Sequence, residues 1–183
     1  MSEKTSLRGG NPLSAVREKY VRWTAYGLLL LVAFLLQSAP HALEIGRTKP
    51  LLLVPLVVAI GLFTGPVGGG AAGAVAGFLW DLYADRLPGF HGLLLLCIGC
   101  VSGLLVVLLM RNNLLTATLL CAGALFLQIL YDWGLSYCLY GGDRPFAALW
   151  GTYLPTAGYT LLVSPLLYIA AFGVTRFFRK RDG

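Results

Sequence analysis

The stretch GPVGGGAAGAVAGFLWD, residues 65–81, dominates the fold of this chain. It consists of glycine, alanine and larger apolar residues, and it ends on a carboxylate. Within it, residues spaced four apart form a regular row, which comprises Gly65, Gly69, Gly73, Gly77 and Asp81. Residues spaced four apart lie near one face of a helix, and rows of small residues let two membrane helices approach until their backbones touch. The stretch therefore predicts a membrane helix with a very close neighbour.

The composition of the whole chain is that of an integral membrane protein. Of its 183 residues, 57% are hydrophobic and only 12% are charged, and the mean hydropathy is +0.76. Ordinary soluble domains carry about 25% charged residues. Apolar segments separated by short polar breaks recur from Trp23 to Phe178, and no polar stretch between them is long enough for a soluble domain. We therefore expect a single membrane domain.

The apolar segments predict an all-α bundle of six membrane-spanning helices. A helix needs roughly 20 apolar residues to cross the hydrocarbon core. The expected spans are residues 24–39, 50–64, 67–83, 92–110, 114–139 and 153–178. Only Gly65 and Pro66 separate the second span from the third, so these two should form a tight antiparallel hairpin.

Basic residues gather at the two ends of the chain, whose formal net charge is +6. By the positive-inside rule this places both termini in the cytoplasm, and it argues against a nucleic-acid-binding surface. Residues 1–23 are expected to form a cytoplasmic tail and an interfacial helix, with a basic extension of the first span as the alternative. Residues 24–178 form the expected six-span domain, and residues 179–183 form a basic cytoplasmic tail.

Two acidic residues fall inside expected spans. Asp81 follows Phe-Leu-Trp and Asp132 follows Ile-Leu-Tyr, so each acid comes after two apolar residues and an aromatic one. An ionisable side chain costs roughly 2.5 to 3.5 kcal/mol at the centre of an inserted helix and usually faces the protein interior. We therefore predict that both carboxylates face inward in the outer half of the membrane, with Arg86 or Arg144 as a counterion. An acid that reaches interfacial water by itself is the alternative for each.

Two functional interpretations of these residues stay open. In the first, the glycine row and Asp81 form a docking surface for a partner's helix. In the second, carboxylates, aromatic rings and an amide surround a ligand that is cationic or heteroaromatic. The expected lining of that pocket is Trp80, Asp81, Gln128, Asp132 and Trp133.

The sequence offers little support for an enzyme, a cofactor or a metal site. His41 and His91 are expected in loops and lack helical metal-binding spacing, and no serine is flanked as in a nucleophile elbow. Cys97 and Cys100 have C-x-x-C spacing, but they fall in an apolar segment with no second pair at metal-site distance. We therefore expect no enzymatic activity, no cofactor and no metal.

The order of these features resembles that of a known family. Leu36-Gln37-Ser38 closes the first expected span, KPLLL at residues 49–53 opens the second, and a Leu-Pro-Gly loop at residues 87–89 follows Asp81. This order resembles the bacterial rod shape-determining protein MreD family from about residue 24 to the end, most specifically over residues 50–103. Members of that family often carry an acid directly after the proline, where this chain has Leu51.

The resemblance implies a place in the bacterial cytoplasmic (inner) membrane, as a multi-pass scaffold of the cell-elongation machinery that supports rod shape and lateral peptidoglycan synthesis. The implied direct partner is the transmembrane helix of MreC. Indirect partners are MreB, RodA and a class B penicillin-binding transpeptidase, and membrane lipids and a second copy of the chain are further candidates. The resemblance also implies a fold similar to the substrate-binding subunits of energy-coupling-factor transporters. A solute- or lipid-binding transporter subunit is therefore the alternative function.

Overall fold

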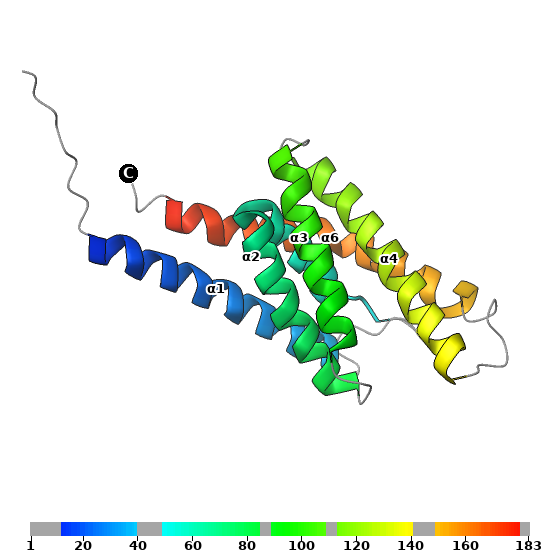
Figure 1. The fold of residues 1–183 in the computed structure, drawn as a ribbon. Coiled ribbons are helices and arrows are strands. Elements are labelled where there is room, and N and C mark those ends of the chain that lie inside the picture. Colours follow the sequence, from blue (N-terminus) through cyan, green and yellow to red (C-terminus); the bar gives the residue numbers. More distant parts are fainter. Residues whose placement is uncertain (1–11, 40–48, 85–88, 109–112, 141–148, 180–183) are drawn as a thin grey trace, which may run out of the picture.

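The computed structural model describes residues 12–39, 49–84, 89–108, 113–140 and 149–179, and these ranges contain helices but no strand (Figure 1). The elements are α1 (Pro12–Ser38), α2 (Leu53–Ala84), α3 (Phe90–Leu108), α4 (Leu114–Tyr140), the π-helical turn η1 (Leu149–Tyr153) and α6 (Leu154–Arg179). Five helices of the described part are long and apolar enough to cross a membrane. The all-helical membrane fold is thus confirmed, whereas the expected count of six is not, because α2 runs through both the second and the third expected span.

α2 turns back on itself at Gly65, where the backbone leaves the helical conformation (φ 79°, ψ −175°) and Pro66 follows. A Cβ added to Gly69 would lie 2.7 Å from the Cα of Gly61. In a straight helix these two positions would be about 12 Å apart. α2 therefore has two helical arms, residues 53–64 and 66–84, which meet beside the turn at the position expected for the hairpin (Figure 1).

Gly65→Ala should destabilise the protein, because a positive φ with ψ near 180° is a conformation that essentially only glycine adopts. We expect a loss of about 1–3 kcal/mol in the free energy of unfolding, measured as a lower thermal midpoint of the purified protein. Gly27→Ala is the matched control: Gly27 lies within α1 and an added Cβ meets nothing within 4 Å. An unchanged midpoint for Gly65→Ala would show that the turn does not depend on this backbone conformation.

The first arm of α2 is the centre of the bundle. All residues from 52 to 62 are buried, and α1, α3, α4 and α6 all contact α2. At 1.5 Å per residue the arm is only about 18 Å long, shorter than the hydrocarbon core of a bilayer. Its short length is compatible with a membrane location because the surrounding helices, not lipid, cover it.

Helix α1 is continuous from Pro12 to Ser38, with no break near residue 23 between an interfacial helix and a span. This continuity favours the alternative, in which the basic segment extends the first span. The hydroxyl of Tyr83 donates to the carbonyl of Ser38 (3.3 Å), so the carboxyl ends of α1 and α2 lie together. The hydroxyls of Tyr26 and Thr175 are 2.8 Å apart, so the middle of α1 meets the end of α6. α1 therefore runs parallel to the second arm of α2 and antiparallel to α6.

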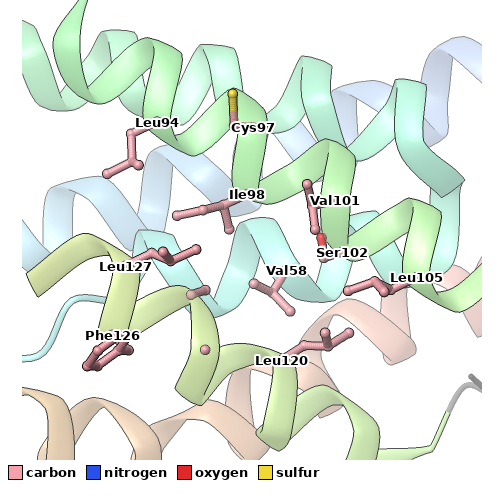
Figure 2. Close-up of a pocket in the computed structure, with 12 residues that line it drawn as sticks. Val58, Leu94, Cys97, Ile98, Val101, Ser102, Leu105, Leu120, Phe126 and Leu127 are labelled. Atoms are coloured by element: carbon pink, nitrogen blue, oxygen red, sulfur yellow. The ribbon is translucent and has the colours of Figure 1, made fainter. Parts of the chain in front are cut away.

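Helices α3 and α4 diverge around an apolar cavity of about 400 Å³ (Figure 2). Side chains of both helices face it, and Val58 of the first arm of α2 lies between them. The main contributors are Leu94, Ile98 and Val101 from α3, and Leu120, Phe126 and Leu127 from α4. None of the five residues expected to line a polar pocket contributes to this cavity.

Candidate functional site

The glycine row of α2 packs against α3 of the same chain. A Cβ at any of the three central glycines would collide with the α3 backbone; the pairs are Gly69 with Gly99, Gly73 with Leu95, and Gly77 with Gly92. At the turn, a Cβ on Gly103 would collide with Gly65. The two backbones therefore touch along most of the length of α3, as small residues permit. The glycine row, which was predicted as a docking surface for a partner's helix, is thus covered by α3 of the same chain.

The close approach also involves glycines of α3, two of which repeat the spacing seen in α2. Gly99 and Gly103 are four residues apart, which is the same small-xxx-small spacing. Each of these glycines would carry its Cβ into the backbone of α2. The close approach thus depends on small residues of both helices.

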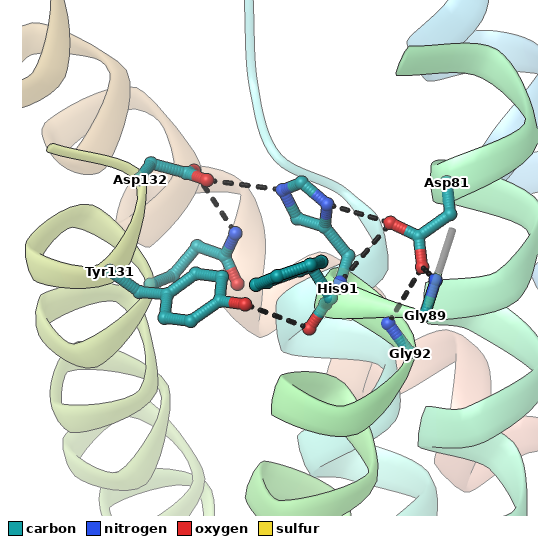
Figure 3. Close-up of polar contacts among 8 residues, drawn as sticks. Asp81, Gly89, His91, Gly92, Tyr131 and Asp132 are labelled. Atoms are coloured by element: carbon teal, nitrogen blue, oxygen red, sulfur yellow. Dashed lines mark hydrogen bonds and ion pairs between the residues drawn. The ribbon is translucent and has the colours of Figure 1, made fainter. Parts of the chain in front are cut away.

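Asp81, the last member of the row, caps the N-terminus of α3 (Figure 3). Its Oδ2 accepts the backbone N–H groups of Gly89 (2.8 Å) and Gly92 (3.1 Å), and its Oδ1 accepts that of His91 (3.1 Å). The first N–H groups of a helix lack intrahelical partners, and a negative charge beside them is favourable. Asp81 of α2 therefore acts as the N-cap of α3, a role that a residue next to the same helix in sequence ordinarily has.

His91 joins Asp81 to Asp132 of α4. Its Nδ1 lies 2.8 Å from Oδ1 of Asp81, and its Nε2 lies 3.1 Å from Oδ1 of Asp132. Trp80 stacks on the imidazole, with ring centroids 5.1 Å apart and planes 10° from parallel. An ionised carboxylate only accepts and a neutral imidazole has one N–H, so both contacts are hydrogen bonds only when the three groups hold two protons between them. Either the imidazole carries both protons and is a cation, or it carries one proton and one of the two carboxyl groups carries the other.

Two further side chains of α4 complete what we call the polar network (Trp80, Asp81, His91, Gln128, Tyr131 and Asp132). The amide Nε2 of Gln128 donates to Oδ2 of Asp132 (3.0 Å), and the hydroxyl of Tyr131 donates to the carbonyl of Phe90 (3.2 Å). Gln128 is fully buried, and its Oε1 has no hydrogen-bond partner among the described residues. The polar network thus connects α2, α3 and α4 at one end of the bundle (Figure 3).

Four of the five residues predicted to line a ligand pocket therefore meet, namely Trp80, Asp81, Gln128 and Asp132. Their polar groups contact one another, His91 and the backbone at the start of α3. Trp133 follows on α4 and is half-buried. Asp81 is 4% exposed, so the prediction that it faces the interior is confirmed. The predicted counterions, Arg86 and Arg144, lie outside the described residues.

His91 is the residue that sequence reasoning missed. It was expected in a loop and was given no role, but it lies in the first turn of α3 and is 3% exposed. The available signal was an ionisable side chain at the beginning of a long apolar run, which in membrane proteins usually marks an interior contact. No group of three or more His, Cys, Asp or Glu side chains in the described ranges is arranged to hold a metal ion.

Comparison with known families assigns the chain. The family model for rod shape-determining protein MreD matches residues 17–179. The chain belongs to the MreD family. The resemblance seen in the sequence is thus confirmed over most of its length, and this MreD-family chain has the apolar helices of a shape-determining membrane protein. Searches of curated proteins and of solved structures gave no significant match, so the expected similarity to energy-coupling-factor transporter subunits stays a prediction.

Proposed function

We propose that this MreD-family protein is a non-enzymatic scaffold of the bacterial cell-elongation complex, which binds the transmembrane helix of MreC and supports rod shape and lateral peptidoglycan synthesis. The observation that carries the proposal is the family match over residues 17–179. The geometry of the polar network is compatible with it, because Asp81 accepts three backbone N–H groups and contacts the imidazole of His91. These groups hold helices together and so suit a rigid scaffold.

We also propose that both arms of α2 cross the membrane, which gives six passes and places both termini in the cytoplasm. Two contacts support this topology: Tyr83 with Ser38 on one side of the bundle, and Tyr26 with Thr175 toward the other. The basic residues at the two ends of the chain support the orientation.

The MreC helix needs a surface other than the glycine row, since α3 covers that row. α1, α4 and α6 carry large apolar side chains that point away from the bundle, such as Leu28 (64% exposed), Leu115 (83%) and Leu162 (79%). We propose that MreC packs on one of these outer helices. The transporter alternative is less well supported, because the side chains expected to bind a solute contact one another instead.

Depletion of the protein in its bacterial host tests the proposal. We expect rod-shaped cells to become wider and rounder, and re-expression of the unsubstituted chain to restore their width. Tagged protein should co-purify MreC from detergent-solubilised membranes. Ala71→Leu, which alters an exposed position on the second arm of α2 outside the proposed MreC surface, is a control that should restore shape fully. Cells that keep their width after depletion, with no MreC in the purified sample, would contradict the proposal.

A further inference from the structure

The polar network holds a histidine between two carboxylates of different helices (Figure 3). Nδ1 of His91 lies 2.8 Å from Oδ1 of Asp81, and its Nε2 lies 3.1 Å from Oδ1 of Asp132. In the described ranges, the titratable groups that face the imidazole from neighbouring helices are these two carboxylates and the phenol of Tyr131, which meets the ring edge-on. The side chains of His91 and Asp81 are buried, whereas that of Asp132 is 15% exposed. Protons can therefore reach the network from water at Asp132.

Asp81 is an ionised acceptor in this arrangement. Its two oxygens accept three backbone N–H groups at the start of α3, and the imidazole Nδ1 is a fourth group within hydrogen-bond distance. An ionised carboxylate offers about four acceptor sites and has no proton of its own. Several hydrogen bonds to a carboxylate stabilise its charged form. Nδ1 of His91 therefore carries a proton and donates it to Asp81.

The contact between His91 and Asp132 requires a second proton. If Nε2 were a bare ring nitrogen, its lone pair would face an oxygen of the Asp132 carboxylate, and the cluster would hold two uncompensated negative charges. An imidazole in an unfolded peptide is more basic than an aspartate carboxylate by roughly 2–3 pH units, so the second proton belongs on Nε2. The face of Trp80, stacked on the imidazole, stabilises the resulting cation.

We propose that His91 is an imidazolium ion and that the polar network is a proton-dependent link between α3 and α4. With both protons present, the ring donates to Asp81 and to Asp132 at once. When the ring gives up one proton to water, the remaining proton stays on Nδ1, because backbone N–H groups of α3 fix the Asp81 carboxylate beside it. The hydrogen bond from His91 to Asp132 is then lost.

The loss of this hydrogen bond should loosen α4 from α3. α3 packs along most of its length on α2 but contacts α4 over a short stretch, so single polar contacts contribute much to their association. The hydrogen bond from Tyr131 to the carbonyl of Phe90 does not need the second proton and would remain. On the topology proposed above, this end of the bundle faces the outside, so the external pH would control the link. The link itself does not depend on MreC binding.

Nitrogen NMR of isotope-labelled histidine in the full-length protein, in lipid bilayers, tests the protonation state directly. The chain has two histidines, so His41→Asn leaves His91 as the single one. An imidazolium ion has two protonated ring nitrogens with similar chemical shifts, whereas a neutral imidazole has one protonated and one bare nitrogen with widely separated shifts. At about pH 7.5, where an unperturbed histidine is mostly neutral, we expect two protonated nitrogens. A bare ring nitrogen at this pH would overturn the proposal.

Asp132→Asn is the matched variant, because it keeps the shape of the side chain but removes the need for the second proton. The Asn amide can donate an N–H to Nε2 of His91 and accept from the amide of Gln128 with its oxygen. A neutral imidazole with its proton on Nδ1 then keeps both contacts. We expect a bare Nε2 in this variant at about pH 7.5. Two protonated nitrogens in the variant would contradict the role of Asp132.

The pH dependence of the thermal midpoint gives an independent readout. Above about pH 6.5 the unfolded chain has lost the second proton, whereas the folded network retains it, so stability falls as the pH rises. Between about pH 6.5 and pH 9, the midpoint of the unsubstituted protein should fall by several degrees more than that of Asp132→Asn. A parallel decline in both proteins would overturn the proposal. The NMR result with Asp132 in place decides the matter even if Asp132→Asn fails to fold.

Discussion

Gly73→Leu should prevent the protein from accumulating in a folded form. A Cβ at this position would collide with the backbone carbonyl of Leu95 and lie 2.9 Å from the backbone nitrogen of Leu96. Backbone atoms cannot rotate away as a flexible side chain does, so α2 and α3 must separate. Overpacking of a core costs typically about 1–3 kcal/mol, and separation of the most extensive helix pair in the bundle should exceed this range. Size-exclusion chromatography of fluorescently tagged protein should show loss of the monodisperse peak.

Ala71→Leu is the matched control for this substitution. Ala71 lies two residues earlier on the same arm of α2 and is exposed, so a larger side chain there enters the lipid. We expect normal accumulation and a normal elution profile. If Gly73→Leu behaved like Ala71→Leu, the close contact between α2 and α3 would not be needed for folding.

The glycine row shows what the sequence can and cannot predict about the fold. The spacing of Gly69, Gly73 and Gly77 correctly predicted a very close helix neighbour, because this follows from side-chain size alone. It did not predict which helix that neighbour is. The choice of α3 depends on matching small residues in both helices, such as Gly99 opposite Gly69.

The number of spans was harder to predict for a related reason. The hairpin position at Gly65 was evident from the Gly-Pro pair, but whether each arm is a separate span depends on how the arms are surrounded. In the most apolar 18-residue window of the α2 span 72% of the residues are buried, against 17% in the corresponding windows of α1 and α6, and the first arm is buried from residue 53 to residue 62. Hydropathy treats an apolar residue that faces protein and one that faces lipid alike, so it cannot separate a short central arm from a full span.

The polar network was predicted in part. Burial of Asp81 could be predicted from the sequence, because it follows from the high cost of an ionisable group in hydrocarbon. The bridge through His91 does not follow, since it joins positions 10 and 41 residues apart in the chain. Local spacing rules describe neighbours on one helix, whereas these contacts exist only after three helices have packed.

Asp81→Leu should destabilise the protein more than any other single substitution in the polar network. The change keeps a side chain of similar size but removes the acceptors for three backbone N–H groups and for the imidazole of His91. A buried donor left without a partner costs about 1–3 kcal/mol. Because several donors are affected, we expect a loss of roughly 3–6 kcal/mol in the free energy of unfolding, seen as a strongly lowered thermal midpoint and low amounts in the membrane.

Asp132→Leu is the matched comparison for Asp81→Leu, because it removes the other carboxylate of the polar network. The Asp132 side chain is 15% exposed and contacts only His91 and Gln128 in the polar network, so its loss should lower the thermal midpoint by less than half as much. The same pair of variants separates a structural acid from a partner-binding one. If Asp81 acts only by stabilising the fold, Asp81→Leu should reduce the amount of folded protein and the amount of co-purified MreC together. If the variant folded normally and lost only MreC, Asp81 would contact the partner, and its hydrogen bonds to α3 would contribute little to the stability of the bundle.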